Sequence, residues 1–184
     1  MDNIKEYEIF IENLAKSGED KIFLNSSAEH AAIVMKTIFK YAKDRIQLYA
    51  NDLNGDVSKD KDYQLEVKKF LERGGKLHVL VEDANTCKQG EMYQIINHYS
   101  FFHPDKIQIR KSNVKVVYRD QNIEGSTSPV HFAVADKTMY RIEIDTNKYL
   151  AKGSFKDVNF SSSLSQTFNS IYNSDTQSVA LDKC

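Results

Sequence analysis

The sequence predicts an α/β protein built on a mixed, mostly parallel β-sheet with helices on both faces. Apolar residues recur at helical spacing over 26–42 and 63–73, whereas 45–50 and 76–81 are short runs typical of strands. The second helix lies between these two strands and ends in Gly74-Gly75. A strand, a helix and a second strand in this order form a crossover, which joins parallel strands.

Length and composition narrow the class of molecule. The chain has 184 residues, 41% of them hydrophobic and 28% charged, as in an ordinary globular protein, and we expect one domain over 1–184. A net charge of −1 gives the whole chain no electrostatic reason to bind nucleic acid or an anionic membrane. No apolar run is long enough to span a bilayer, and the charged start at 1–6 lacks the core of a signal peptide, so the cytoplasm is the predicted location.

The cysteines and the acidic loops give no sign of a metal site. Cys184 is the last residue, and Cys87 lies in a polar run that predicts a loop, with no His or Cys at zinc-binding spacing. The acidic run 51–56 matches a calcium-binding loop over three residues only, so we interpret it as a solvated turn. We therefore expect neither a metal nor another cofactor.

The elements before the crossover follow from periodicity and capping. Apolar residues at helical spacing predict a helix over 2–16 in the N-terminal segment 1–18, and a short strand is predicted over 21–24. Ser26 and Glu29 match a capping box, in which the serine oxygen accepts a free backbone N–H. The next helix is therefore predicted to begin at this box and to run to about residue 42.

Acidic and amide side chains follow both crossover strands. Asn51 and Asp52 come directly after the first strand, and Glu82 and Asp83 after the second. Ligands of parallel sheets bind beyond the C-terminal ends of the strands. The sequence therefore predicts a binding site there, with Asn51 and Glu82 as ligand-binding residues.

A helix over 91–102 precedes two predicted strands, 107–111 and 115–119, which hold the densest basic stretch of the chain. Its residues are Lys106, Arg110, Lys111, Lys115 and Arg119. One interpretation is contact with the phosphates of a nucleic acid or another ligand. The other is an edge strand that charge protects from pairing with a second chain.

The most informative run is 129–145, which predicts two short buried strands joined by a tight turn at Asp136-Lys137. His131, Asp136, Arg141 and Glu143 lie in or beside these strands, and burying a charge is costly unless it is paired. Because Arg141 and Glu143 are two residues apart, they share one face of a strand, so a structural ion-pair network is one explanation. An active site, working or degenerate, is the other.

The rest of the C-terminal half is less regular. A polar loop is predicted over 120–128, and scattered apolar anchors occupy 149–160. A last amphipathic helix is predicted over 161–172. The polar tail 173–184 is expected to be loose.

Three runs resemble one half of the phospholipase D superfamily. They are 42–48 at the end of a helix, 67–80 with its Gly-Gly pair, and 168–172 near the C-terminus. With the order of the elements they cover roughly residues 22–172. The resemblance implies the fold of a phospholipase-D-like half-unit.

The catalytic signature of that superfamily is His-x-Lys, four further residues and Asp. Aligning on Asp136 places His131 at the lysine position and Pro129 at the histidine position. Aligning on His131 instead places Ala133 at the lysine position and Thr138 at the Asp position, and no His-x-Lys occurs in the chain. Because proline cannot act as a nucleophile, the resemblance implies a catalytically degenerate domain.

Such a domain resembles the binding, regulatory or accessory subunits of bacterial systems, including defence-type complexes. The superfamily's two motifs often meet across a dimer, so the resemblance implies a homodimer or a partner in a larger complex. It also implies that the former cleft around His131 and Arg141 keeps a phosphate-bearing or nucleotide ligand.

Two alternatives remain open. One is an active, metal-independent phosphodiesterase or nuclease with a rearranged site. In it His131 acts as nucleophile or general acid, Arg141 clamps the phosphate, and Glu143 or Asp136 orients His131. The other is a structural partner-binding protein, such as an immunity or adaptor subunit, which predicts an exposed apolar interface.

Overall fold

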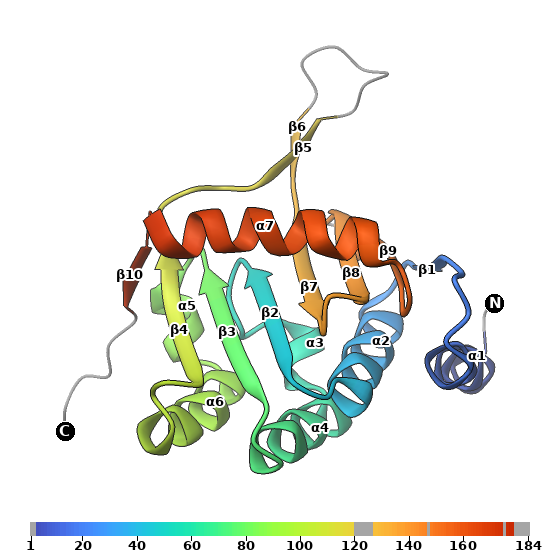
Figure 1. Ribbon diagram of the computed structural model, residues 1–184, viewed down its shortest axis with the longest axis horizontal. Coiled ribbons are helices and arrows are strands. Elements are labelled where there is room, and N and C mark those ends of the chain that lie inside the picture. The colour runs from blue at the N-terminus through green and yellow to red at the C-terminus, as the bar shows by residue number, and fades with distance from the viewer. Residues whose placement is uncertain (1–2, 120–126, 147, 175, 179–184) are drawn as a thin grey trace.

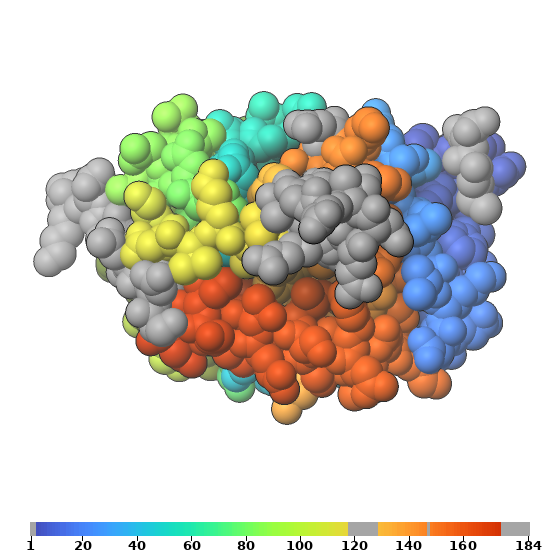
Figure 2. Space-filling view, turned by 90° about the horizontal axis from the view of Figure 1, so that it is seen from above, coloured from blue at the N-terminus to red at the C-terminus, as the bar shows by residue number. Residues whose placement is uncertain are grey.

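The structure is an eight-stranded mixed sheet with helices on both faces (Figure 1). The computed structural model describes residues 3–119, 127–146, 148–174 and 176–178. Helices α2, α4 and α6 cover one face of the sheet, α7 crosses the other face, and α1 packs against α2. Seen from above, α7 runs along one side of the molecule, and α1 and α2 close one end (Figure 2). The predicted α/β class is confirmed.

The elements have the following bounds. The helices are α1 (Ile4–Ser17), α2 (Ala28–Tyr41), α3 (Asp56–Lys59), α4 (Lys61–Glu72), α5 (Ala84–Lys88), α6 (Glu91–Phe102) and α7 (Val158–Ser174). The strands are β1 (Phe23–Asn25), β2 (Arg45–Ala50), β3 (Lys76–Val81), β4 (Ile107–Ser112), β5 (Val117–Arg119), β6 (Thr127–Pro129), β7 (His131–Ala135), β8 (Met139–Asp145), β9 (Leu150–Ser154) and β10 (Thr176–Ser178). Within the described ranges, no helix combines the length and apolar character that crossing a bilayer requires.

The sheet is mixed, as predicted, but parallel pairing does not prevail in it. The strand order is β1-β9-β8-β7-β2-β3-β4-β10, and only the central strands β2, β3 and β4 are mutually parallel. The other neighbouring pairs of this sheet are antiparallel. The reason is that β7, β8 and β9 are joined by short turns, and short turns permit only antiparallel neighbours.

The predicted crossover from β2 through α4 to β3 is confirmed. The two strands pair in parallel from Arg45 and Lys76 to Ala50 and Val81. After α4, Gly74 has a φ of +88°, and a Cβ on Gly75 would lie 2.4 Å from the Phe70 ring. Glycine alone fits both positions without strain, so this pair lets the chain turn from helix into strand.

A hydrophobic core lies on each face of the sheet. Ala133 and Ala135 of β7 face the core under α2 and α4, whereas Phe132 and Val134 face α7 and pack with Phe168. Successive strand residues point to opposite faces, so a strand buried on both faces is apolar at every position. This explains why the sequence of β7 after its first residue is an unbroken apolar run.

Two local predictions in the N-terminal half were wrong. Ser27, not Ser26, caps α2, and its Oγ accepts the N–H of His30 at 3.1 Å. Cys87 lies in α5 rather than in a loop. Its side chain is fully buried, and this burial raises the pKa of the thiol to about 12.

Three strands in the C-terminal half were not predicted. Strand β6 begins within the predicted loop 120–128 and pairs with β5. The stretch with scattered apolar anchors contains β9, in which a Cβ on Gly153 would lie 2.4 Å from both the Phe23 ring and the Tyr140 carbonyl oxygen. The stretch expected to be loose contains β10, which pairs with β4. Residues 120–126 of the predicted loop and 179–184 of the predicted tail lie outside the described residues.

Candidate functional site

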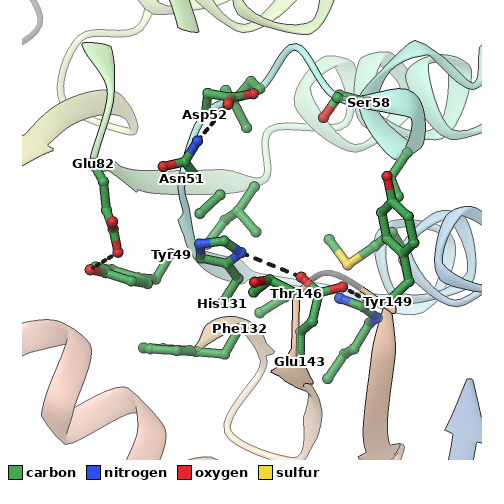
Figure 3. Close-up of a pocket in the computed structure, with 18 of the residues that line it drawn as sticks. Tyr49, Asn51, Asp52, Ser58, Glu82, His131, Phe132, Glu143, Thr146 and Tyr149 are labelled. Carbon is green, nitrogen blue, oxygen red and sulfur yellow. Dashed lines mark hydrogen bonds and ion pairs between the residues drawn. The ribbon is translucent and has the colours of Figure 1, made fainter. Parts of the chain in front are cut away.

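A cavity of about 420 Å³ lies at the edge of the sheet where β2 and β3 end and β7 begins. Asn51 and Asp52 line it from the end of β2, Glu82 from the end of β3, and His131 from the start of β7. Figure 3 shows these side chains around the cavity, with the His131 ring near the centre, between Asn51 and Glu143. We refer to it as the carboxyl-edge cavity. It lies where the sequence predicts a binding site.

His131 and Glu143 face each other across the β7–β8 ladder. His131 Nδ1 lies 3.3 Å from Glu143 Oε2, and Arg141 Nη2 donates to Glu143 Oε1 at 3.1 Å (Figure 3). Arg141 and Glu143 thus form the ion pair that their two-residue spacing allows. The contact at Nδ1 leaves Nε2 as the ring nitrogen of His131 directed away from Glu143.

Arg141 is held inside the protein. Its side chain is only 8% exposed, and its Nε donates to Asn25 Oδ1 at 3.1 Å. Asn25 in turn donates from Nδ2 to the Tyr149 carbonyl at 2.7 Å. Asn25 belongs to β1, which no sequence pattern linked to this site. A guanidinium engaged in this way holds Glu143 in position.

Glu143 keeps its charge despite its burial. Burial is the largest influence and raises the pKa of this carboxyl, but the hydrogen bond from His131 and the charge of Arg141 together outweigh it. The pKa therefore lies below its ordinary value of 4.5. Two donors on one buried carboxylate offset much of the cost of removing it from water.

Tyr49 forms a second polar cluster of the cavity and was missed from the sequence. Its hydroxyl lies 2.7 Å from Glu82 Oε1 and 2.9 Å from the Val114 carbonyl, and it accepts the N–H of Val116 at 3.1 Å. Burial is the main cause that raises the pKa of Tyr49, so the phenol stays protonated. Lys115 Nζ lies 3.6 Å from Glu82 Oε2. The sequence signal that could have assigned Tyr49 to the site was its position in a strand, two residues before Asn51.

Asn51 and Asp52 form the wall of the cavity at the end of β2. Asn51 Nδ2 donates to Asp52 Oδ2 at 2.7 Å, and Asp52 Oδ1 accepts the N–H of Asn54 at 2.7 Å. The Asn51 carbonyl accepts the N–H groups of Glu82 at 3.0 Å and of Asp83 at 2.7 Å. These bonds join the ends of β2 and β3, which brings Asn51 and Glu82 onto one cavity.

Comparisons with known proteins find similarity in structure only. No protein-family model matches the sequence, and no curated protein is significantly similar to it. TrmBL2, described as an archaeal chromatin protein, has a TM-score of 0.60 at 16% identity, over 93% of this chain and 61% of its own. Nuc from Salmonella typhimurium, a phospholipase D family member, has a TM-score of 0.59 at 12% identity, over 87% of this chain and 98% of its own.

NucT from Helicobacter pylori has a TM-score of 0.55 at 14% identity, and the match covers 85% of this chain and 98% of NucT. The chain has a phospholipase-D-like fold. It spans about three fifths of the length of TrmBL2 and nearly all of Nuc and NucT.

In this phospholipase-D-like fold, the stretch aligned with the catalytic signature spans both ends of β7. Pro129, at the histidine position, and His131, at the lysine position, both line the carboxyl-edge cavity. Asp136 lies beyond the opposite end of the strand, where its carboxylate accepts three backbone N–H groups at the start of β2. The prediction that Asp136 orients His131 is therefore wrong, because the length of β7 separates them.

The members of the predicted basic stretch make different contacts in the described part of the chain. The Arg110 guanidinium lies 4.0 Å from the centre of the Tyr172 ring and donates to the Tyr172 carbonyl, and Lys115 is the one member that lines the cavity. Lys106 and Lys111 lie near opposite ends of β4. The side chain of Arg119 lies outside what the structure describes.

Charge in the cavity is unevenly distributed. Its described lining contains the carboxylates of Asp52, Asp56, Glu82 and Glu143, against the cations of Lys115 and Arg141. Both cations lie within 4 Å of a carboxylate. Among the described residues, no group of three His, Cys, Asp or Glu side chains is placed to hold a metal ion.

Proposed function

We propose that this chain is a non-catalytic phospholipase-D-like module that binds a small ligand in the carboxyl-edge cavity and serves as a regulatory or accessory subunit. The supporting observation is that Arg141 pairs with Glu143 and Lys115 with Glu82. Phosphoryl transfer develops negative charge that donors and cations must stabilise in the transition state. Here the strong cations of the described lining already have carboxylate partners.

The lining favours a neutral or positively charged polar ligand. Carboxylates outnumber the strong cations, so an anion would meet net repulsion in a partly enclosed site. Ser58 and Thr146 add hydroxyl groups, and Leu53 and Phe132 add apolar surface. A few polar groups on an apolar wall are typical of small-molecule sites. The phosphate-bearing ligand expected from the sequence at this edge is the competing proposal.

The similar proteins do not decide the function. One is described as a chromatin protein with a novel mode of DNA binding, and another as a phospholipase D family member. Identities of 12–16% support a shared fold alone, so the function must be argued from the chemistry of the site. We further propose that the module works as a homodimer or within a larger complex, which light scattering of the purified protein measures.

Calorimetric titration with putrescine, glucose and AMP tests the ligand class. We expect saturable binding of the cationic or the neutral probe and at least tenfold weaker binding to the Asp52→Asn and Glu82→Gln variants. An exposed carboxylate on another surface, Glu19→Gln, is the matched control. Binding of AMP that His131→Ala abolishes would contradict the proposal and restore a phosphate-bearing ligand at this edge.

One observation favours a second function, a metal-independent phosphodiesterase or nuclease. The contact between His131 Nδ1 and Glu143 fixes the orientation of the imidazole, as carboxylate–histidine pairs do in catalysis. Nε2 would then be the nucleophile. This function predicts hydrolysis of bis(p-nitrophenyl) phosphate or DNA in EDTA that His131→Ala abolishes and the exposed-surface variant His98→Ala keeps. Equal rates in wild type and His131→Ala would reject it.

A further inference from the structure

A second cavity, also of about 420 Å³, lies at the opposite edge of the sheet. It is bounded by the start of β2, the turn after β7 and the middle of α7, so it is separate from the carboxyl-edge cavity. Three basic side chains line it, from Lys43, Arg45 and Lys137. We refer to it as the basic cavity.

The carboxylates of the basic cavity already have partners. Asp136 accepts the backbone N–H groups of Lys43 at 2.5 Å, Asp44 at 2.9 Å and Arg45 at 2.9 Å. Asp44 Oδ1 lies 3.3 Å from Lys76 Nζ. Both negative charges are thus held by groups other than the three basic side chains of the cavity.

Among the described residues, by contrast, those basic side chains have no carboxylate of their own. In the described part of the chain, no ion pair joins Lys43, Arg45 or Lys137 to an acidic group. The Nε of Arg45 is buried and has no hydrogen-bond acceptor among the described residues. The positive charge of the three side chains is therefore available to an anion in the cavity.

The backbone fixes the position of these cations. Asp136 and Lys137 have φ values of 50° and 64°, and the turn is closed by the Thr138 N–H on the Ala135 carbonyl at 3.1 Å. The Asp136 N–H donates to the Arg45 carbonyl at 3.0 Å, which ties this turn to the start of β2. Arg45 and Lys137 therefore reach the cavity from two segments that are bonded to each other.

The far wall of the cavity is polar and ordered. Gln47 is buried, and its Nε2 donates to Asn169 Oδ1 at 2.7 Å. The Ser165 hydroxyl donates to Gln47 Oε1 at 2.6 Å. On the α7 side, the described lining of the cavity therefore offers the lone pairs of the Ser165 hydroxyl and no carboxylate.

We propose that the basic cavity binds a phosphate dianion, either inorganic phosphate or the terminal group of a phosphomonoester, with Arg45 as its anchor. Guanidinium groups bind phosphate oxygens through paired hydrogen bonds, and two lysines add the remaining positive charge. This site is independent of the ligand proposed for the carboxyl-edge cavity.

Calorimetric titration of the full chain with inorganic phosphate, in a buffer of low ionic strength without other multivalent anions, tests the proposal. We expect saturable binding that weakens at least tenfold in Arg45→Gln and at least threefold in Lys137→Gln. Lys68→Gln, an exposed lysine on α4, and His131→Ala at the other cavity should both bind as the wild type does. Should Arg45→Gln fail to fold by circular dichroism, Lys137→Gln decides, because that side chain projects from a surface turn.

The same titration with AMP separates the two sources of phosphate. Tighter binding of AMP than of phosphate identifies a phosphomonoester as the ligand, and weaker binding identifies the free ion. No saturable binding of phosphate or AMP to the wild type would overturn the proposal. Binding that His131→Ala abolishes and Arg45→Gln leaves unchanged would also overturn it, because the anion would then occupy the carboxyl-edge cavity.

Discussion

The two ends of β7 use charge in opposite ways. At its first residue, His131 contacts Glu143, which Arg141 also holds, so positive and negative side chains neutralise one another. Just past its last residue, Asp136 is bound by backbone N–H groups, and the nearby basic side chains form no ion pair with a carboxylate among the described residues. The two cavities have similar volumes, and both are lined by acidic and basic side chains. The ligand proposed for each cavity therefore depends on both the balance of charge in its lining and the groups that its carboxylates contact.

Among substitutions that test the difference between the two ends of β7, Glu143→Ala is expected to reduce stability the most. It should lower the free energy of unfolding by about 3–5 kcal/mol, because it leaves Arg141 buried without a carboxylate. Urea denaturation measures this loss. The double replacement Arg141→Met with Glu143→Leu is the control and should cost much less, since no charge is left unpaired. A loss below about 1 kcal/mol for Glu143→Ala would mean that water solvates the pair.

The pH dependence of stability tests whether Glu143 is charged in the folded protein. The pKa of Glu143 in the folded state lies below the ordinary 4.5, so its stabilisation is complete above pH 4.5 and is lost as the pH falls through the lower folded value. Glu143→Gln should therefore reduce stability by about 1.5–3 kcal/mol at neutral pH, and less below pH 4. Urea denaturation at several pH values compares the two proteins. A constant difference from pH 7 to pH 3 would contradict this.

A smaller loss, about 1–2 kcal/mol, is expected for Asp136→Ala at the other end of β7. Three backbone N–H groups lose their acceptor, but they lie near the surface, where water replaces it in part, as at a helix N-cap. Thermal and urea denaturation measure the change, with Asp136→Asn as a milder control that keeps an acceptor oxygen. A loss as large as that of Glu143→Ala would remove the distinction between the two ends.

The smallest effect is expected for Lys115→Gln. The Lys115 side chain is 75% exposed, and exposed ion pairs contribute less than about 1 kcal/mol. Stability should therefore stay close to that of Lys68→Gln, while a cationic ligand of the carboxyl-edge cavity should bind more tightly, because Glu82 loses its partner. Weaker binding of that ligand, measured by calorimetry, would argue against a cationic ligand there.

Much of the fold was predictable because it depends on local patterns. The strands 45–50 and 76–81 and the helix 91–102 have their predicted bounds, and the turn at Asp136-Lys137 lies where expected. Helical periodicity and the Gly-Gly pair involve residues that are close in sequence, so they can be recognised without knowledge of the tertiary structure. By contrast, β9 and β10 are short strands whose pairing partners, β8 and β4, stabilise them.

The candidate site was predictable in position but not in its network. The rule that ligands bind at the C-terminal ends of parallel strands led to Asn51 and Glu82, and two-residue spacing led to the pair of Arg141 and Glu143. The contact between Arg141 and Asn25 joins residues 116 positions apart. No spacing in the chain encodes such a contact, and the assignment of Asp136 to the site failed for the same reason.

The ends of the sheet bear on how copies of the chain associate. Its two edge strands, β1 and β10, are each only three residues long. An edge strand can pair with a strand of a second chain through its unpaired backbone N–H and C=O groups, and strands of three residues offer few such groups. We therefore expect β1 and β10 to contribute little to the association of copies by continuation of the sheet, and a second copy to be recognised mainly through side chains on a face of the molecule.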